Sequence, residues 1–142
     1  MLDEFDLVQM ADERIVFGGG FNQEAGAYGA VAILEIASGT VTPAATWDPA
    51  GTYGGQPVPA PDGRSVAVSF SREGEGGNHS LILKPGEGVT ELNASISAWA
   101  PDGTAVLAVR LVDAKPHMFV IDLATKQEKD LGPGFGGFWT QG

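Results

Sequence analysis

The sequence predicts an all-β fold made of a repeated antiparallel unit of four strands. Three observations support this prediction. Apolar stretches of five to eight residues alternate with Gly, Pro, Asp and Asn, and helical spacing longer than two turns is almost absent. Gly and Pro together make up about a fifth of the chain without following a collagen period. The sequence also matches itself at an offset of 40 residues, as expected of short strands joined by tight turns in a repeat.

Short strands are predicted along the whole chain, and their even spacing favours antiparallel sheets over a parallel α/β arrangement. The strand after the first Pro-Asp-Gly turn is apolar or small on both faces: Val66, Val68 and Phe70 point one way, and Ala67 and Ser69 the other. We therefore expect it in a sheet stacked between two neighbours, which must bury both faces. The predicted strands are residues 5–10, 14–18, 27–36, 40–45, 64–70, 80–83, 89–92, 96–99, 104–111, 117–123, 128–131 and 138–140.

The repeat is clearest at a Pro-Asp-Gly turn followed by an apolar strand. Residues 61–68 match residues 101–108, and residues 11–17 give a weaker copy. A strand, a short turn and another strand then recur at residues 33–41, 81–89 and 120–128. Four strands in about forty residues is the size of one propeller blade. The chain is expected to be a single domain, residues 1–142, with blade units at 5–46, 57–92 and 96–131. An all-β sandwich is the alternative.

The last unit carries a family resemblance. Residues 99–103 read Trp-Ala-Pro-Asp-Gly, and an apolar strand, a second apolar strand at 118–123 and a polar turn follow. This pattern resembles the Pro-Asp-Gly repeat of TolB-type, WD-repeat-like bacterial propellers. The second unit has Pro59 where Trp99 stands, and the first lacks the Pro and the Gly. The resemblance implies structural roles, in turns and between blades, for Trp99, Pro101, Asp102 and Gly103.

Three blades leave the question of how the ring closes. Propellers have about four to eight blades, and an open stack of three would expose two apolar end faces. The sequence therefore predicts a homodimer with a shared ring of about six blades, or else a piece of a longer propeller. Residues 134–142 are relevant to both alternatives, because Trp139 follows Trp99 by 40 residues, which is the length of one repeat. This tail is expected to be the first strand of a further blade, or a strand exchanged with the partner.

Composition and charge exclude several classes of function. The chain has no Cys, which excludes disulfide scaffolds, Cys-ligated metals and thiol nucleophiles. With 18 Asp and Glu against 8 Lys and Arg, the net charge of −10 disfavours nucleic acids as partners. The N-terminus is acidic before Arg14, and no apolar run has the length of a membrane span. We expect a soluble chain without a signal peptide or membrane contact, with the cytoplasm as the favoured compartment.

No catalytic, metal or cofactor site is predicted. His79 and His117 hold related places in their units and are expected to be repeat residues rather than a base and a ligand. Asp62 and Asp102 lie in Pro-Asp-Gly turns, where an Asp side chain caps backbone N–H groups. The other candidates are expected to be solvated loops: residues 71–77 with Glu73 and Glu75 for calcium, and the glycine run 18–20 for phosphate.

Four aromatic residues form the candidate binding or inter-blade surface: Tyr53, Trp99, Phe135 and Trp139. Aromatic side chains stack on sugars or peptides when exposed and also pack between sheets. The sequence favours a non-enzymatic binding or scaffolding module whose ligand is a protein, a peptide or a sugar. The alternative is a carbohydrate-active or peptidase-associated propeller with its site at the channel between chains. A third reading, a chain made to study propeller assembly, has no sequence feature that tests it.

Overall fold

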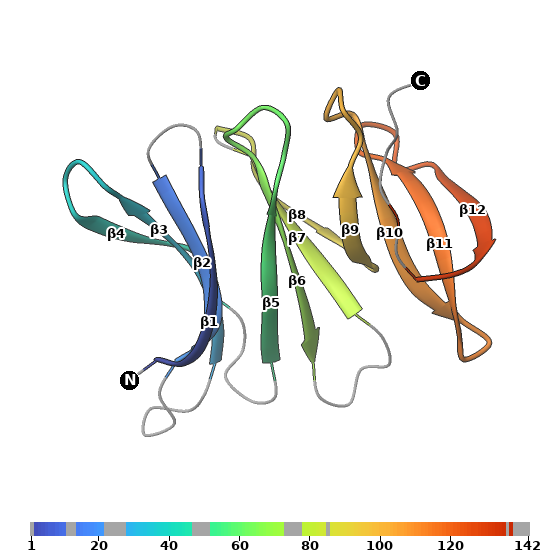
Figure 1. Cartoon of the computed structure of the whole chain (residues 1–142), viewed down its shortest axis with the longest axis horizontal. Helices are drawn as coiled ribbons and strands as arrows, with labels where there is room; N and C mark the ends of the chain where they lie inside the picture. Colours follow the sequence, from blue (N-terminus) through green and yellow to red (C-terminus); the bar gives the residue numbers. More distant parts are fainter. Residues whose placement is uncertain are drawn as a thin grey trace.

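The computed structural model describes residues 2–10, 14–21, 28–46, 52–72, 78–84, 86–135 and 137. Within these residues the chain forms three antiparallel sheets of four strands, each built from consecutive strands. Figure 1 shows the sheets side by side in sequence order, with the second between the other two. The strands are β1 (Leu2–Gln9), β2 (Arg14–Phe21), β3 (Tyr28–Glu35), β4 (Thr40–Thr46), β5 (Thr52–Pro59), β6 (Val66–Arg72), β7 (Asn78–Lys84), β8 (Gly88–Leu92), β9 (Ser95–Trp99), β10 (Ala105–Val112), β11 (Lys115–Asp122) and β12 (Glu128–Pro133).

The Pro-Asp-Gly turns join the first and second strands of the second and third sheets in the same way. Gly63 has φ 69° and Gly103 has φ 72°, a left-handed conformation that glycine adopts without steric cost. Each glycine N–H donates to the carbonyl of the residue three positions earlier, at 3.1 Å for Gly63 and 2.9 Å for Gly103. The self-match in the sequence is therefore a match of backbone conformation.

The second sheet is buried on both faces, which confirms the prediction from its apolar alternation. One face packs against the first sheet and the other against the third, so the core consists of two layers of side chains between sheets. The first layer is Met10, Val66, Val68, Phe70, Leu81 and Leu83 with partly buried Ile33. The second is Ala60, Ala67, Ile82, Leu92, Ala94, Ile96, Trp99, Val106, Ala108, Phe119, Ile121 and Leu123.

Strand β5 was not predicted, because two glycines and two prolines interrupt its sequence. It pairs with β6 through Tyr53↔Ser71 and Pro57↔Val68, with an irregularity between Gly54 and Pro57. The glycine run 18–20, expected to be a loop, continues β2 and pairs with both β1 and β3. The strand predicted at 138–140 and the loop glutamates Glu73 and Glu75 lie outside the described residues.

No helix long and apolar enough to span a membrane occurs in the described part of the chain.

Candidate functional site

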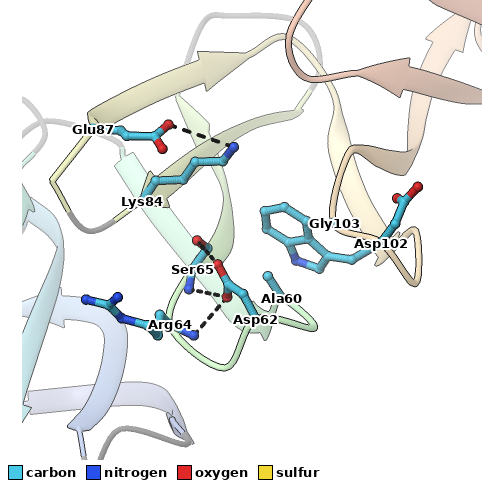
Figure 2. Close-up of a pocket in the computed structure, with 9 residues that line it drawn as sticks. Ala60, Asp62, Arg64, Ser65, Lys84, Glu87, Asp102 and Gly103 are labelled. Atoms are coloured by element: carbon cyan, nitrogen blue, oxygen red, sulfur yellow. Dashed lines mark hydrogen bonds and ion pairs between the residues drawn. The ribbon is translucent and has the colours of Figure 1, made fainter.

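A cavity of about 330 Å³ lies where the second sheet meets the third, beside both Pro-Asp-Gly turns (Figure 2). A smaller cavity of about 80 Å³ shares Lys84 and Glu87 with it and adds Lys126. The seam between these two sheets thus has a concave surface to consider as a binding site. The larger cavity is lined by Ala60, Asp62, Arg64, Ser65, Lys84, Glu87, Trp99, Asp102 and Gly103.

The carboxylates of the two turn aspartates of this cavity already accept hydrogen bonds from residues of their own turns. The carboxylate of Asp62 accepts hydrogen bonds from the N–H of Arg64 at 2.8 Å, and from the N–H and hydroxyl of Ser65 at 2.7 and 2.6 Å. Burial raises the pKa of Asp62, but the bonds from Ser65 and Arg64 outweigh it and hold the pKa below its usual value. The N–H and hydroxyl of Thr104, at 3.0 and 2.7 Å, likewise lower the pKa of Asp102. Both carboxylates have the capping role that the sequence predicts.

The remaining charged groups of the cavity do not converge. Lys84 Nζ lies 4.0 Å from Glu87 Oε2, and both side chains are substantially exposed to solvent. Figure 2 shows the side chains of Arg64 and Asp102 pointing to opposite sides of the cavity. The carbonyl of Arg64 accepts a hydrogen bond of 2.8 Å from Arg14 Nη2, which ties this turn to the first sheet. The cavity is polar, but its geometry does not assemble a nucleophile, a base or a ligand set.

The structure describes the side chains of two of the four aromatic candidates. Trp99 is 7% exposed, and its indole Nε1–H donates to the carbonyl of Val58 at 2.9 Å, so it joins β9 to β5 across the seam. Phe135 is 78% exposed, in the chain that follows β12. Tyr53 is placed only by its backbone in β5, and Trp139 lies outside the described residues. Trp99 and Phe135 are not brought together.

The two histidines occupy matching places, each facing a carboxylate on the outermost strand of its sheet. His79 Nδ1 in β7 lies 3.3 Å from Glu91 Oε1 in β8. His117 Nδ1 in β11 lies 3.1 Å from Asp130 Oδ2 in β12. The His79 ring also stacks on Phe70, with centroids 5.4 Å apart. These are structural pairs across neighbouring strands, in agreement with the expectation that the histidines are repeat residues.

Sequence reasoning missed a buried hydroxyl pair that connects the second and third sheets. Ser80 is fully buried and donates to the carbonyl of Ala94 at 2.7 Å. Its Oγ lies 3.0 Å from Ser69 Oγ, and the N–H of Ile96 points at both oxygens, at 3.1 Å from Ser69 and 3.2 Å from Ser80. Serines within an apolar run were the available signal, because a buried hydroxyl requires a partner.

Arg110 is the second feature that the sequence did not predict. Its Nη1 and Nη2 bind both carboxylate oxygens of Glu128 at 2.9 and 2.7 Å, and its Nε donates to the carbonyl of Asn93 at 2.7 Å. The guanidinium also lies 4.8 Å from the ring centroid of Phe119. The hydrogen bonds to Glu128 raise the pKa of Arg110 and lower that of Glu128. This clamp holds β10, β12 and the turn before β9 together.

Metal ligation has no support in the part of the chain that the structure describes. No group of three or more His, Cys, Asp or Glu lies close enough there to hold an ion.

Comparison with known proteins gives the fold. No family model matches the sequence, and no curated protein matches it. Solved structures do match: TolB from Acinetobacter baumannii superposes with a TM-score of 0.64 and 20% identity over 91% of this chain. A structure from a study of two prolyl endopeptidases superposes with a TM-score of 0.66 and 10% identity over 93% of this chain.

Both matches are to β-propellers. The three sheets are propeller blades. We number them first (β1–β4), second (β5–β8) and third (β9–β12). The chain spans 32% of TolB and 23% of the endopeptidase, so it covers only part of either protein. At such identities the likeness shows the fold alone.

Proposed function

We propose that the protein is a non-enzymatic binding or scaffolding module that completes its propeller ring with a second copy of itself. The supporting observation is the contrast between the second blade, buried on both faces, and the outer face of the third blade. That outer face comprises Leu107, Val109, Leu111, Met118 and Val120, which alternate along β10 and β11 with residues packed on the second blade. Leu111 is 58% exposed on it, whereas Val66 and Val68 in the second blade are at most 1% exposed.

A second copy is the partner that fits this face. Heterologous contacts between identical subunits close into a ring when the rotation permits. The outer face of the third blade consists mainly of leucine and valine, like the face that the second blade presents to the first, which has Val66, Val68, Leu81 and Leu83. Two chains around a twofold axis would then give a ring of about six blades, within the range that propellers use.

The described side chains support this proposal over the enzymatic alternative. The carboxylates of Asp62 and Asp102 accept hydrogen bonds within their own turns. His79 and His117 face carboxylates on neighbouring strands. These groups have structural partners, and none of them faces another across the cavity. The likeness to a prolyl endopeptidase extends to the fold and carries no catalytic residue to this chain.

The mass of the chain in solution tests the proposal. Light scattering on the purified 142-residue chain is expected to give about twice the 14.7 kDa of one chain. A single-chain mass at every concentration would contradict ring closure by a second copy. That result would favour the second candidate, a piece of a longer propeller, which is suggested by the 32% coverage of TolB.

A pair of variants tests which face is involved. Leu111→Glu is expected to shift the mass to that of one chain, because pairing would bury an unpaired carboxylate against apolar side chains. Val89→Glu is the matched control, since Val89 is 48% exposed on β8 of the second blade and away from the outer face of the third. Thermal unfolding followed by circular dichroism should show both variants folded. Dissociation by both substitutions, or by neither, would contradict the assigned face.

A further inference from the structure

The outer face of the third blade is already covered along part of its length. Leu107 is only 6% exposed, although it belongs to neither of the layers packed between blades. The chain after β12 lies against it: a Cβ on Gly137 would sit 3.0 Å from Leu107 Cδ2 and 2.9 Å from Met118 Cε. A Cβ on Gly134 would sit 3.0 Å from Met118 Sδ. The backbone of the tail therefore contacts the side chains of this face directly.

Gly137 lies in the position that a residue of the first strand of a following blade would take. Strand β5 packs beside β1, β2 and β3 of the first blade, and β9 packs beside β5, β6 and β7 of the second. Gly137 contacts Leu107 of β10 and Met118 of β11, the second and third strands of the third blade. In the sequence Trp139 stands 40 residues after Trp99, which ends β9. Position and sequence spacing agree.

We propose that the outer face of the third blade is a docking surface for the first strand of a blade, and that the chain after β12 docks there within a single chain through Gly134 and Gly137. At Gly134 the backbone lies against Met118, and at Gly137 it lies against Met118 and Leu107, with no side chain between them. The N–H of Gly134 also donates to the carbonyl of Pro116 at 2.9 Å, which anchors the start of the tail to β11. Residues 138–142 lie outside the described residues.

The second copy would use the same surface. This step of the inference rests on the proposed function. In a closed ring the place beside β10 and β11 belongs to β1 of the partner. The first blade already has β1 as its own first strand, so it offers no vacant position for an exchanged tail. The tail and the second copy therefore compete for one surface, and the tail weakens dimerisation by the free energy of its own docking.

Removing the tail tests the docking directly. A chain ending at Pro133 is compared with the full chain for oxidation by hydrogen peroxide, read by peptide mass spectrometry. Sulfoxidation of Met118 is expected to accelerate about threefold or more, because its thioether loses the cover of the tail. Met10, 3% exposed between the first and second blades, is the internal reference and should not change. Both chains are measured at concentrations where scattering gives the single-chain mass.

A point variant repeats the test in the full-length chain. Gly137→Asp places a charged side chain against the apolar ends of Met118 and Leu107, so it should weaken the docking of the tail and speed the oxidation of Met118. Phe135→Ser is the matched control in the same segment, because Phe135 is 78% exposed. The control should leave the oxidation rate unchanged.

The concentration at which the dimer forms separates the two proposals. Truncation is expected to lower that concentration about threefold or more, in line with the gain in Met118 oxidation. Faster oxidation of Met118 in the truncated chain, with a single-chain mass for both chains at all concentrations, would support the docked tail and contradict ring closure by a second copy. If the full chain forms a dimer, and truncation changes neither the concentration at which the dimer forms nor the oxidation rate of Met118, the docked tail is contradicted and ring closure is supported.

Discussion

At the scale of single residues, the hydroxyls of Ser69 and Ser80 are the most consequential polar groups in the core. They supply a donor to the carbonyl of Ala94 and acceptors to the N–H of Ile96, both in the segment that enters the third blade. A buried backbone group without a partner costs about 1–3 kcal/mol. The pair thus fixes where β9 begins relative to β6 and β7.

Ser80→Ala is expected to destabilise the chain by about 1–3 kcal/mol, because the carbonyl of Ala94 loses its donor in a buried site. Urea unfolding followed by tryptophan fluorescence measures the change. Ser38→Ala is the control, since Ser38 is exposed in the β3–β4 turn and bonds only to Glu35 and Thr40 among the described residues. Equal losses from both substitutions would contradict the role given to Ser80.

Residue roles within one turn could be predicted from sequence, and roles that join separate strands could not. The Pro-Asp-Gly pattern predicts capping by Asp62 because the donors lie two and three residues away. The partners of Ser80 and Arg110 lie 11 to 18 residues away, in other strands and turns. Their identity depends on the register of sheets that the local sequence does not encode.

At the scale of elements, small side chains set the distance between the second and third blades. Ala67 in β6 and Ala108 in β10 are both fully buried in the layer that joins these blades. Packing density in such layers leaves little room for additional methylene groups. The apolar positions of these strands thus differ in size requirement, although they are alike in hydrophobicity.

Ala67→Leu is expected to cost about 1–3 kcal/mol, because the larger side chain pushes the second and third blades apart. Denaturant unfolding gives the loss of stability, and the near-ultraviolet circular dichroism of Trp99 at the same seam should change with it. Ala124→Leu is the control, in the exposed turn between β11 and β12. If Ala67→Leu lowers the free energy of unfolding no more than Ala124→Leu does, the tight packing proposed for this seam is contradicted.

The elements that the sequence predicted are those with regular alternation, such as β6 and β10. Strand β5, which lacks this alternation, shows why a strand can be missed. Its Gly54, Pro57 and Pro59 are typical of turns, and its strand conformation comes from pairing with β6 and from packing beside the first blade. Tertiary contacts override local propensity there.

At the scale of the whole molecule, ionised carboxylates stabilise turns and strand pairs throughout the second and third blades. Hydrogen bonds lower the pKa of each of them in the folded chain. The backbone N–H of Gly132 is the main cause for Asp130, and the N–H of Thr125 is the main cause for Asp122. The full set is Asp62, Asp102, Asp122, Glu128 and Asp130.

The free energy of unfolding is expected to fall as the pH drops below about 4.5. A group with a lower pKa in the folded than in the unfolded chain contributes fully above its unfolded value, about 3.9 for Asp and 4.3 for Glu. That contribution is lost as the pH falls through the folded pKa. Urea unfolding between pH 7 and pH 3 measures the slope, and Glu128→Gln should flatten it by removing one such group. Stability that increases steadily below pH 4.5 would contradict this account.

The number of blades was within reach of the sequence, and the extent to which the outer face of the third blade is covered was not. Repeats at 61–68 and 101–108 count the units, because each turn and strand pair is a local structure. Whether a residue of this face is covered, as Leu107 is, or exposed, as Leu111 is, depends on the shape of a whole blade face and on the positions of Gly134 and Gly137. These properties arise only once three sheets are stacked.

Each blade consists of four consecutive strands, and this order affects how the chain is made as well as how it is held. During synthesis the ribosome releases β1 to β4 before β5, and β5 to β8 before β9. Each of the three described sheets can complete its ladder of hydrogen bonds from residues that have already emerged, so none of its strands needs a partner from a later blade. Sequence-local pairing also shortens the loops that must close, which speeds folding for a protein made of β-strands.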